Sequence, residues 1–198
     1  MYSIIISLSE MMSNRENDLQ NLTGKVLLAT PNISDAYIHK SIVFVCEHSK
    51  KGARPLIVNK IIPQLPFITH MKLDDIIGNA KIHMGGNADL DNCYIIHTNS
   101  NLSDNTISIC DDIFLTKCDD IVRSLTFVNN EPERKILCLG CYNWAPQQLE
   151  NEITSNYWIP IPADEALIFG RSSVDKWNKA FLKIGLHSSL FLNKSGMA

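Results

Sequence analysis

The sequence predicts a soluble protein of the α/β (α+β) class, built around a largely buried β-sheet. Short runs of Val, Ile and Leu with apolar residues on both faces recur along the chain, as in strands that are covered on both sides. Fewer stretches have the spacing of amphipathic helices, and they fall between these runs and near the C-terminus. A length of 198 residues with 45% hydrophobic and 20% charged residues suits one globular domain.

The chain is expected to begin with an extension and one apolar strand. Residues 1–20 change from a short apolar start to a polar run, and we expect a flexible extension there. No basic residue precedes the apolar start and no small-residue cleavage site follows it, so it does not predict a signal peptide. Residues 25–30 then read as an apolar strand that Pro31 closes.

Residues 41–48 are predicted to form a central strand in the interior of the sheet. A period of two places the side chains of Cys46 and His48 on the same face of this strand. A polar turn follows, and the chain is expected to return as a strand over residues 56–59. Pro55 should mark the beginning of that strand, because proline cannot donate a ladder hydrogen bond.

The middle of the chain alternates short strands with polar turns. An imperfect helical pattern covers residues 67–77, and a clearer one runs from an N-cap at Thr116 to about Val128. Strands are predicted at residues 81–84, 93–98, 106–110 and 135–140. The strand at 106–110 alternates polar and apolar residues, which is typical of a half-exposed hairpin partner.

The C-terminal part is expected to contain two helices. A short helix begins near Pro146, since proline suits the first turn, and residues 159–162 are extended. A last helix follows, with Ser173 as its N-cap and Gly185 as its stop. No repeat or linker divides the chain.

We therefore expect a single domain over residues 21–187, followed by a loose tail at residues 188–198. The formal net charge of −3 and the scattered basic residues make direct nucleic-acid binding an unfavoured function. No apolar run is long enough to span a bilayer, so no membrane partner is predicted. Six cysteines without regular spacing suit reduced thiols in the cytoplasm.

Cys46 and His48 are the candidates for chemistry. If they share a strand face, the imidazole could lower the pKa of the thiol and assist a nucleophilic attack. The alternative is a buried cysteine of the core beside a hydrogen-bonded histidine at a strand end. We favour the second interpretation, because the sequence offers no third group to orient the histidine.

Cys138 and Cys141 have the C-x-x-C spacing of redox and zinc motifs. Cys138 lies inside a predicted apolar strand, whereas those motifs need a turn or a helix start where the thiolates can converge. A zinc site that adds Cys46 and His48 is conceivable, but no second motif completes a set of four ligands. We predict no metal site and no cofactor.

The stretch that begins the short helix suggests a binding pocket. Trp144 could be the wall of a small-molecule or peptide pocket, and Gln148 a polar handle in it. Glu150 also has a plain explanation, because the helix dipole favours acidic residues in a first turn.

These residues occur in an order that is similar to a known family. The landmarks are Leu22-Thr23-Gly24-Lys25, Ala29-Thr30-Pro31, Cys46-Glu47-His48, Gly52-Ala53, Asn59, Gly85-Gly86, Trp144, Gln148-Leu149-Glu150, Trp158, Phe169 and Trp177. Over about residues 20–187 the chain resembles the bacterial AlgH/YqgE family. The resemblance implies an AlgH-like fold, with a bifurcated mixed sheet that closes into a pseudo-barrel and helices at its flanks. The family takes its name from a member genetically linked to alginate regulation and is sometimes labelled a transcriptional regulator, but it offers no active site to transfer residue by residue.

We expect the landmark residues to form a ligand-binding cleft at one edge of the sheet, made by Glu47, Asn59, Gly85, Gly86, Trp144, Gln148 and Glu150. The favoured function is a non-enzymatic binding or regulatory module that contacts a protein or a small ligand. The alternative is a thiol-dependent or hydrolase-like enzyme that uses Cys46 and His48. A DNA-binding repressor is disfavoured, because no helix-turn-helix with a basic recognition helix is apparent.

Overall fold

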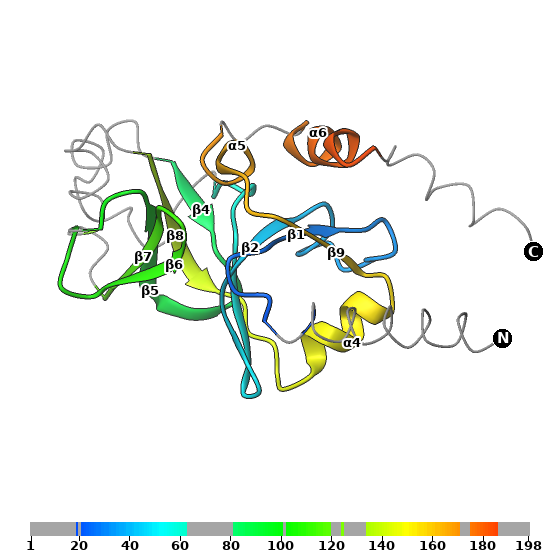
Figure 1. The fold of residues 1–198 in the computed structure, drawn as a ribbon, viewed down its shortest axis with the longest axis horizontal. Coiled ribbons are helices and arrows are strands. Elements are labelled where there is room, and N and C mark those ends of the chain that lie inside the picture. The colour runs from blue at the N-terminus through cyan, green and yellow to red at the C-terminus, as the bar shows by residue number, and fades with distance from the viewer. Residues whose placement is uncertain are drawn as a thin grey trace, which may run out of the picture.

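The computed structural model describes residues 19, 21–62, 81–100, 102–119, 124, 134–170 and 175–185. These residues form two β-sheets with three short helices around them (Figure 1), which confirms the mixed α and β class. The predicted helix at residues 67–77, most of the extension at 1–20 and the tail at 188–198 lie outside the described residues.

The first sheet has four antiparallel strands in the order β3-β2-β1-β9. Their bounds are Val26–Ala29 for β1, Ile42–Ser49 for β2, Gly52–Ile57 for β3 and Trp158–Ile161 for β9. The predicted interior position of β2 is confirmed. Pro55 does not begin the returning strand: it lies within β3, opposite Val45, next to the point where the register of β2 shifts. A proline is tolerated there because the ladder is already irregular at a bulge.

The second sheet has five strands in the order β4-β8-β5-β7-β6. Their bounds are Ile82–Met84 for β4, Ala88–His97 for β5, Thr106–Cys110 for β6, Ile113–Cys118 for β7 and Lys135–Cys141 for β8. β4 runs parallel to β8, and the other neighbours are antiparallel. The predicted strands of this region are all present, and β6 is the expected half-exposed hairpin partner.

The strand β7 was not expected, and the N-cap predicted at Thr116 is wrong. Thr116 pairs with Ile95 of β5 and with Thr106 of β6. Its hydroxyl lies 2.8 Å from the Nε2 atom of His97 and 2.8 Å from the hydroxyl of Thr106. Cross-strand bonds of this kind suit a β-branched residue in a strand, and they use the oxygen that a helix cap would need. Of the residues predicted to follow in that helix, Lys117 and Cys118 belong to β7, whereas Ser124 is helical.

The two sheets are joined through β3. Beyond β8 the chain turns onto β3, where Ala53 and Trp144 exchange backbone hydrogen bonds of 3.1 and 2.9 Å. At the other end of β3, the amide of Ile57 donates to the carbonyl oxygen of Gly85, next to β4. The sheet is therefore bifurcated, as the family resemblance implied. It does not close into a pseudo-barrel, because among the described residues the outer strands β6 and β9 do not pair with each other.

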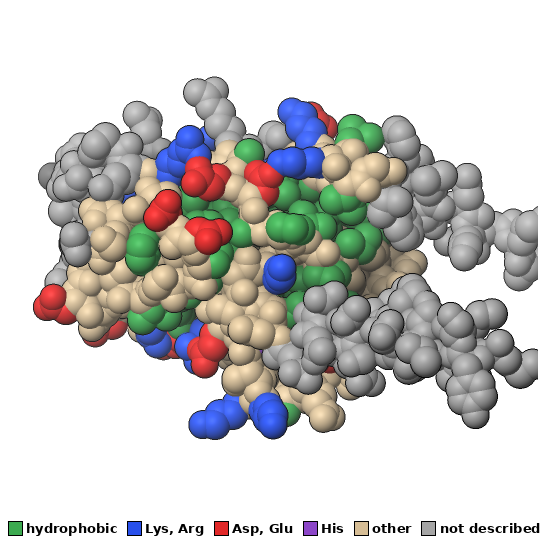
Figure 2. Space-filling model, in the orientation of Figure 1, with side chains coloured by type: hydrophobic (Ala, Val, Ile, Leu, Met, Phe, Trp, Pro, Cys, Tyr) green, Lys and Arg blue, Asp and Glu red, His purple; other side chains and the backbone are tan. Residues whose placement is uncertain are grey.

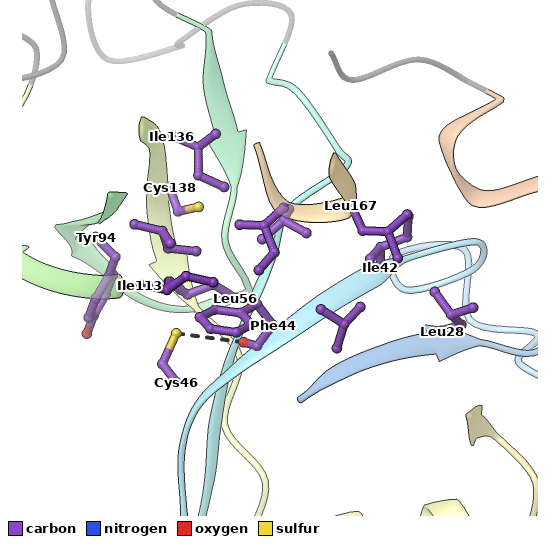
Figure 3. Close-up of a cluster of buried hydrophobic side chains, with 14 of the residues drawn as sticks. Leu28, Ile42, Phe44, Cys46, Leu56, Tyr94, Ile113, Ile136, Cys138 and Leu167 are labelled. Carbon is purple, nitrogen blue, oxygen red and sulfur yellow. Dashed lines mark hydrogen bonds between the residues drawn. The ribbon is translucent and has the colours of Figure 1, made fainter. Parts of the chain in front are cut away.

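Apolar side chains fill two regions. One cluster lies between the sheets and contains Phe44, Leu56 and Ile113 (Figure 3). The other lies on the far face of the first sheet, where α4 (Gln148–Thr154) contributes Leu149. Burial on both faces of β2 explains its near-continuous apolar sequence.

Two further helices follow β9. α5 (Glu165–Ile168) is capped by the side chain of Asp164, which accepts from two backbone amides of its first turn. α6 (Lys176–Lys183) packs Trp177 and Phe181 into the inter-sheet cluster, and Gly185 ends it with a positive φ, as predicted. The predicted cap Ser173 is outside the described residues, and Asp175 holds the N-cap position. Within the described residues, no helix is long and apolar enough to cross a membrane.

Candidate functional site

A β-bulge separates the two candidate catalytic side chains. Val45 pairs with Pro55 but Glu47 pairs with Arg54, so β2 has one extra residue at Cys46. The extra residue breaks the period of two. Cys46 belongs to the cluster between the sheets, whereas His48 contacts the side of the sheet that carries α4. The expectation that both side chains point the same way is therefore wrong.

Both ring nitrogens of His48 are engaged. The backbone amide of Leu22 donates to Nδ1 at 3.0 Å, so the ring proton is on Nε2. Nε2 then donates to the Oε1 atom of Glu150 at 3.1 Å, and the side chain of His48 is only 2% exposed. A general base needs a free lone pair near the reacting group. In this arrangement His48 connects the end of β2 to Glu150 on α4 and to Leu22 in the segment before β1.

Cys46 is a residue of the core. It is 3% exposed and packs beside Phe44, whose carbonyl oxygen its Sγ atom approaches at 3.7 Å (Figure 3). Burial, followed by the nearby thiols of Cys138 and Cys141, raises its pKa well above the usual value for a thiol. Such a thiol is a poor nucleophile, because attack requires the thiolate.

The helix α4 is held in place by one carboxylate that sequence reasoning left out of the site. Oε2 of Glu152 accepts from the indole N–H of Trp144 at 3.0 Å and from that of Trp158 at 2.7 Å. Oε1 of the same residue accepts from the side-chain amide of Gln148 at 2.8 Å. The two indoles meet edge to face, with centroids 5.4 Å apart. Trp144 and Gln148, predicted as wall and handle of a pocket, are parts of this half-buried network.

Gly85 and Gly86 are required by backbone packing. A Cβ atom on Gly86 would lie 1.9 Å from the carbonyl carbon of Cys141, and one on Gly85 would lie 2.2 Å from the carbonyl oxygen of Gly140. Because neither position carries a side chain, the backbone of β8 can pass close to the end of β4. The space that a side chain would take is filled by protein backbone and is not a cradle for a ligand.

The remaining cleft candidates lie far apart. Asn59 accepts from the backbone amide of Ile42 and donates to the carbonyl oxygen of Lys40, at the start of β2. Glu47 lies near the other end of β2, five residues from Ile42 and hence about 17 Å away at the rise of a strand, and forms an exposed ion pair with Arg54. The structure thus brings Trp144, Gln148 and Glu150 together but leaves Asn59 and Glu47 at separate places. In the described part of the chain, no three His, Cys, Asp or Glu residues are grouped so as to hold a metal ion.

A different feature opens to the surface between the two sheets. The outer strands β6 and β9 both contribute half-buried apolar side chains that pack on the inter-sheet cluster. We call this surface the open seam and define it by Ile109, Cys110, Ile159, Ile161 and Ala163. Figure 2 shows apolar side chains gathered in the middle of this face. The seam lies where closure into a barrel would have paired β6 with β9, so its side chains keep part of their surface in water.

Acidic residues border the open seam at both strand ends. Asp111 and Asp112 form the exposed turn after β6, and Asp164 and Glu165 follow β9. Figure 2 shows both acidic and basic side chains beside the apolar area. Burial and the neighbouring Asp111 raise the pKa of the half-buried Cys110, and Lys25 opposes this shift. Asp164 and Glu165 are ion-paired with Lys183 and Arg134. The apolar floor of the seam therefore has a rim of mixed charge, in which Asp111 and Asp112 form an exposed acidic turn.

The sequence contains a signal for the seam in the alternating patterns of β6 and β9. β9 alternates Ile159 and Ile161 with prolines, and the short strand β6 has an alternating pattern. Such patterns reveal a one-sided strand but not which sheet edge it occupies. Glu152 was likewise visible as an acidic residue of a helix, but its two tryptophan partners could be found only from the packing of α4.

Comparisons with known proteins agree with this architecture. A family model described as AlgH-like matches residues 26–189. A UPF0301 protein of Bradyrhizobium diazoefficiens is 35% identical over 190 residues, which cover 89% of this chain and 88% of that protein. A UPF0301 protein of Rhizobium rhizogenes is 33% identical and covers 98% of this chain and 100% of its own length.

Two solved structures have the same fold. The solution structure of the AlgH protein from Pseudomonas aeruginosa superimposes with a TM-score of 0.66 at 23% identity, and the match covers 89% of this chain and 96% of that one. The crystal structure of a Corynebacterium diphtheriae protein gives a TM-score of 0.63 at 18% identity, with 81% and 86% covered. At these identities the likeness concerns the fold alone.

Proposed function

The chain belongs to the AlgH-like family, and we propose that it is a non-enzymatic binding module that recognises a partner protein through the open seam. The observation that carries this proposal is the half-burial of apolar side chains on two outer strands that do not pair with each other. Contiguous apolar surface on a folded protein is typical of an interaction site.

The rim of the seam indicates the chemistry of the partner. Its floor, made by residues such as Ile159 and Ile161, favours apolar side chains, and the exposed acidic turn of Asp111 and Asp112 favours basic ones. We infer that the occupant is a segment of another protein in which apolar residues are flanked by Lys or Arg. Opposite charges at a rim guide the encounter and the register, while the apolar centre supplies most of the affinity.

The geometry around the predicted catalytic pair supports binding over catalysis. The thiol of Cys46 is enclosed in the core, and the ring of His48 has a partner on each nitrogen. Both side chains therefore stabilise the strand from which they project. We also propose a regulatory role through protein contacts and a location in the cytoplasm, which six cysteines without regular spacing favour.

Site-specific photo-crosslinking in cells tests this function. A photoreactive residue at Ile161 places the probe in the seam, and one at Leu90, an exposed apolar residue outside it, is the matched control. We expect discrete adducts with another protein from position 161, and their loss when Ile159→Glu is added. The proposal is contradicted if both positions give the same set of adducts. It is also contradicted if position 161 crosslinks only to residues of this chain.

A further inference from the structure

Two cysteines face each other directly across neighbouring strands of the second sheet. Cys93 of β5 and Cys118 of β7 are register partners, and they form the last pair of the β5–β7 ladder. Beside this pair the register of β5 against β8 shifts between Ala88 and Cys93. Both residues are buried, with 1% and 7% of their surface exposed.

The spacing of such a pair matches the geometry of a disulfide bond. Residues directly opposite in an antiparallel ladder have Cα atoms about 4.5 to 5.5 Å apart, within the range of about 4.4 to 6.8 Å seen for disulfides. Their Cβ atoms lie about 4.5 to 5.5 Å apart, so they must approach by up to about 1 Å. The position at the end of the ladder makes this movement feasible, because Cys118 is the last residue of its strand.

The second sheet separates this pair from the other four thiols. Cys46, Cys138 and Cys141 belong to the cluster between the sheets, and Cys110 packs against it. Tyr94 and Leu115 also belong to that cluster, so strand alternation directs Cys93 and Cys118 to the opposite face. Each is thus the natural partner of the other, and a competing disulfide would require a side chain to pass through the sheet.

We propose that Cys93 and Cys118 are a reversible dithiol site that small-molecule disulfides oxidise to a cross-strand disulfide. Because both thiols are buried, exchange takes place when the end of the β5–β7 ladder opens locally. The thiolate of one cysteine then attacks the small disulfide, forms a mixed disulfide and releases one small thiol. The second cysteine attacks the mixed disulfide at the protein sulfur and releases the second small thiol, which takes up the remaining proton. One small disulfide is reduced for each protein disulfide formed, and the new bond fastens β5 to β7.

Equilibration with glutathione tests the site. Reduced protein is incubated in buffers of increasing ratio of oxidised to reduced glutathione, once as the folded protein and once by refolding from denaturant, so that burial cannot prevent exchange. Remaining thiols are then alkylated and the cysteines are assigned by peptide mapping. We expect a mass lower by about 2 Da, the two hydrogens removed in oxidation, with the peptides that contain Cys93 and Cys118 joined.

Two variants are the controls. In Cys118→Ser the internal disulfide should be absent and Cys93 should carry at most one glutathione. In Cys110→Ser, which removes the half-buried thiol on the other side of the sheet, the joined peptides should form at the same glutathione ratio as in the parent. The proposal is overturned if Cys93 and Cys118 remain thiols by both routes at every ratio, or if either bonds mainly to another cysteine.

Discussion

The imidazole of His48 and the thiol of Cys46 lie on opposite faces of β2, although one residue separates them in the sequence. The cause is the extra residue that the bulge inserts between Val45 and Glu47. The same bulge directs His48 toward Glu150 on α4. The sequence suggests that Cys46 and His48 are a nucleophile and its base, but Cys46 is a residue of the core and His48 binds α4 through Glu150.

This separation predicts the reactivity of Cys46. Its thiol is buried and its pKa is raised, so alkylation requires an opening of the core. We expect Cys46 to react at least roughly 100-fold more slowly than in the unfolded chain, and later than the half-buried Cys110. The measurement is the alkylation rate of each cysteine between about pH 5 and 9, resolved by peptide mass mapping. Rapid reaction of Cys46 near neutral pH would restore the thiol-enzyme hypothesis.

Glu152 is predicted to be a main support of α4. Glu152→Ala leaves the buried indole N–H groups of Trp144 and Trp158 without their acceptor. Because hydrogen bonds to a charged group are worth about 1.5 to 3 kcal/mol each, we expect a loss of about 3 kcal/mol or more in the free energy of unfolding. Urea unfolding followed by tryptophan fluorescence measures it. The control Glu150→Ala, which removes one part-exposed bond to His48, should cost less; equal costs would refute the role of Glu152.

Gly86 is predicted to be required for folding, with no part in ligand binding. Its Cβ atom in Gly86→Ala would lie 1.9 Å from the backbone of Cys141, which cannot move without displacing β8. We expect a destabilisation of at least about 3 kcal/mol. Gly185→Ala is the matched control, because that position has a positive φ but nothing within 4 Å of an added Cβ, so only about 1 kcal/mol is expected. Similar stability of the two variants in urea titrations would contradict this explanation.

The buried Lys176 is expected to make the free energy of unfolding depend on pH. Its buried ammonium donates to the carbonyl oxygens of Val58, Ile168 and Gly170 at 3.2 to 3.3 Å. Burial lowers its pKa to about 8, against a smaller opposing effect of Cys138. The unfolded value is about 10.4. Between these values the unfolded chain binds more protons than the folded protein, so the contribution of this site to stability rises with pH.

The comparison of the parent with Lys176→Met isolates this effect from other titrations. From about pH 8 to 10, the free energy of unfolding of the parent should rise relative to that of Lys176→Met. The rise should be at most about 1.4 kcal/mol per pH unit. Lys179→Met, at an exposed position of the same helix, is the control for the loss of a lysine from α6. A difference for Lys176→Met that stays constant over this pH range would show that its ammonium is not perturbed by burial.

Much of the sheet could be predicted from the sequence because burial leaves a local signature. β2 and β8 are apolar on both faces, and both were expected as buried strands. β7 was missed because Thr116, followed three residues later by Asp119, resembles a helix N-cap. The cross-strand partners of Thr116 come from positions 10 and 19 residues away. Such long-range contacts override local preference.

The site was harder to predict than the fold, because unusual residues attract a chemical interpretation. Cys46, His48 and Trp144 stand out in the sequence, yet each is held inside by packing or hydrogen bonds. The open seam consists of ordinary residues such as Ile159 and Ile161, whose exposure depends on which strands form the sheet edges. One extra residue in β2 was enough to invert the expected geometry of the catalytic pair.

Recognition through the open seam is tested most directly by selecting peptide ligands from a random displayed library on the purified protein. We expect the selected peptides to share an apolar centre flanked by Lys or Arg, and their affinity to fall at least roughly tenfold, about 1.4 kcal/mol, for Ile161→Glu. Leu90→Glu, outside the seam, should bind them like the parent. Peptides without a common pattern, or peptides that bind Ile161→Glu as well as the parent, would contradict recognition through the open seam.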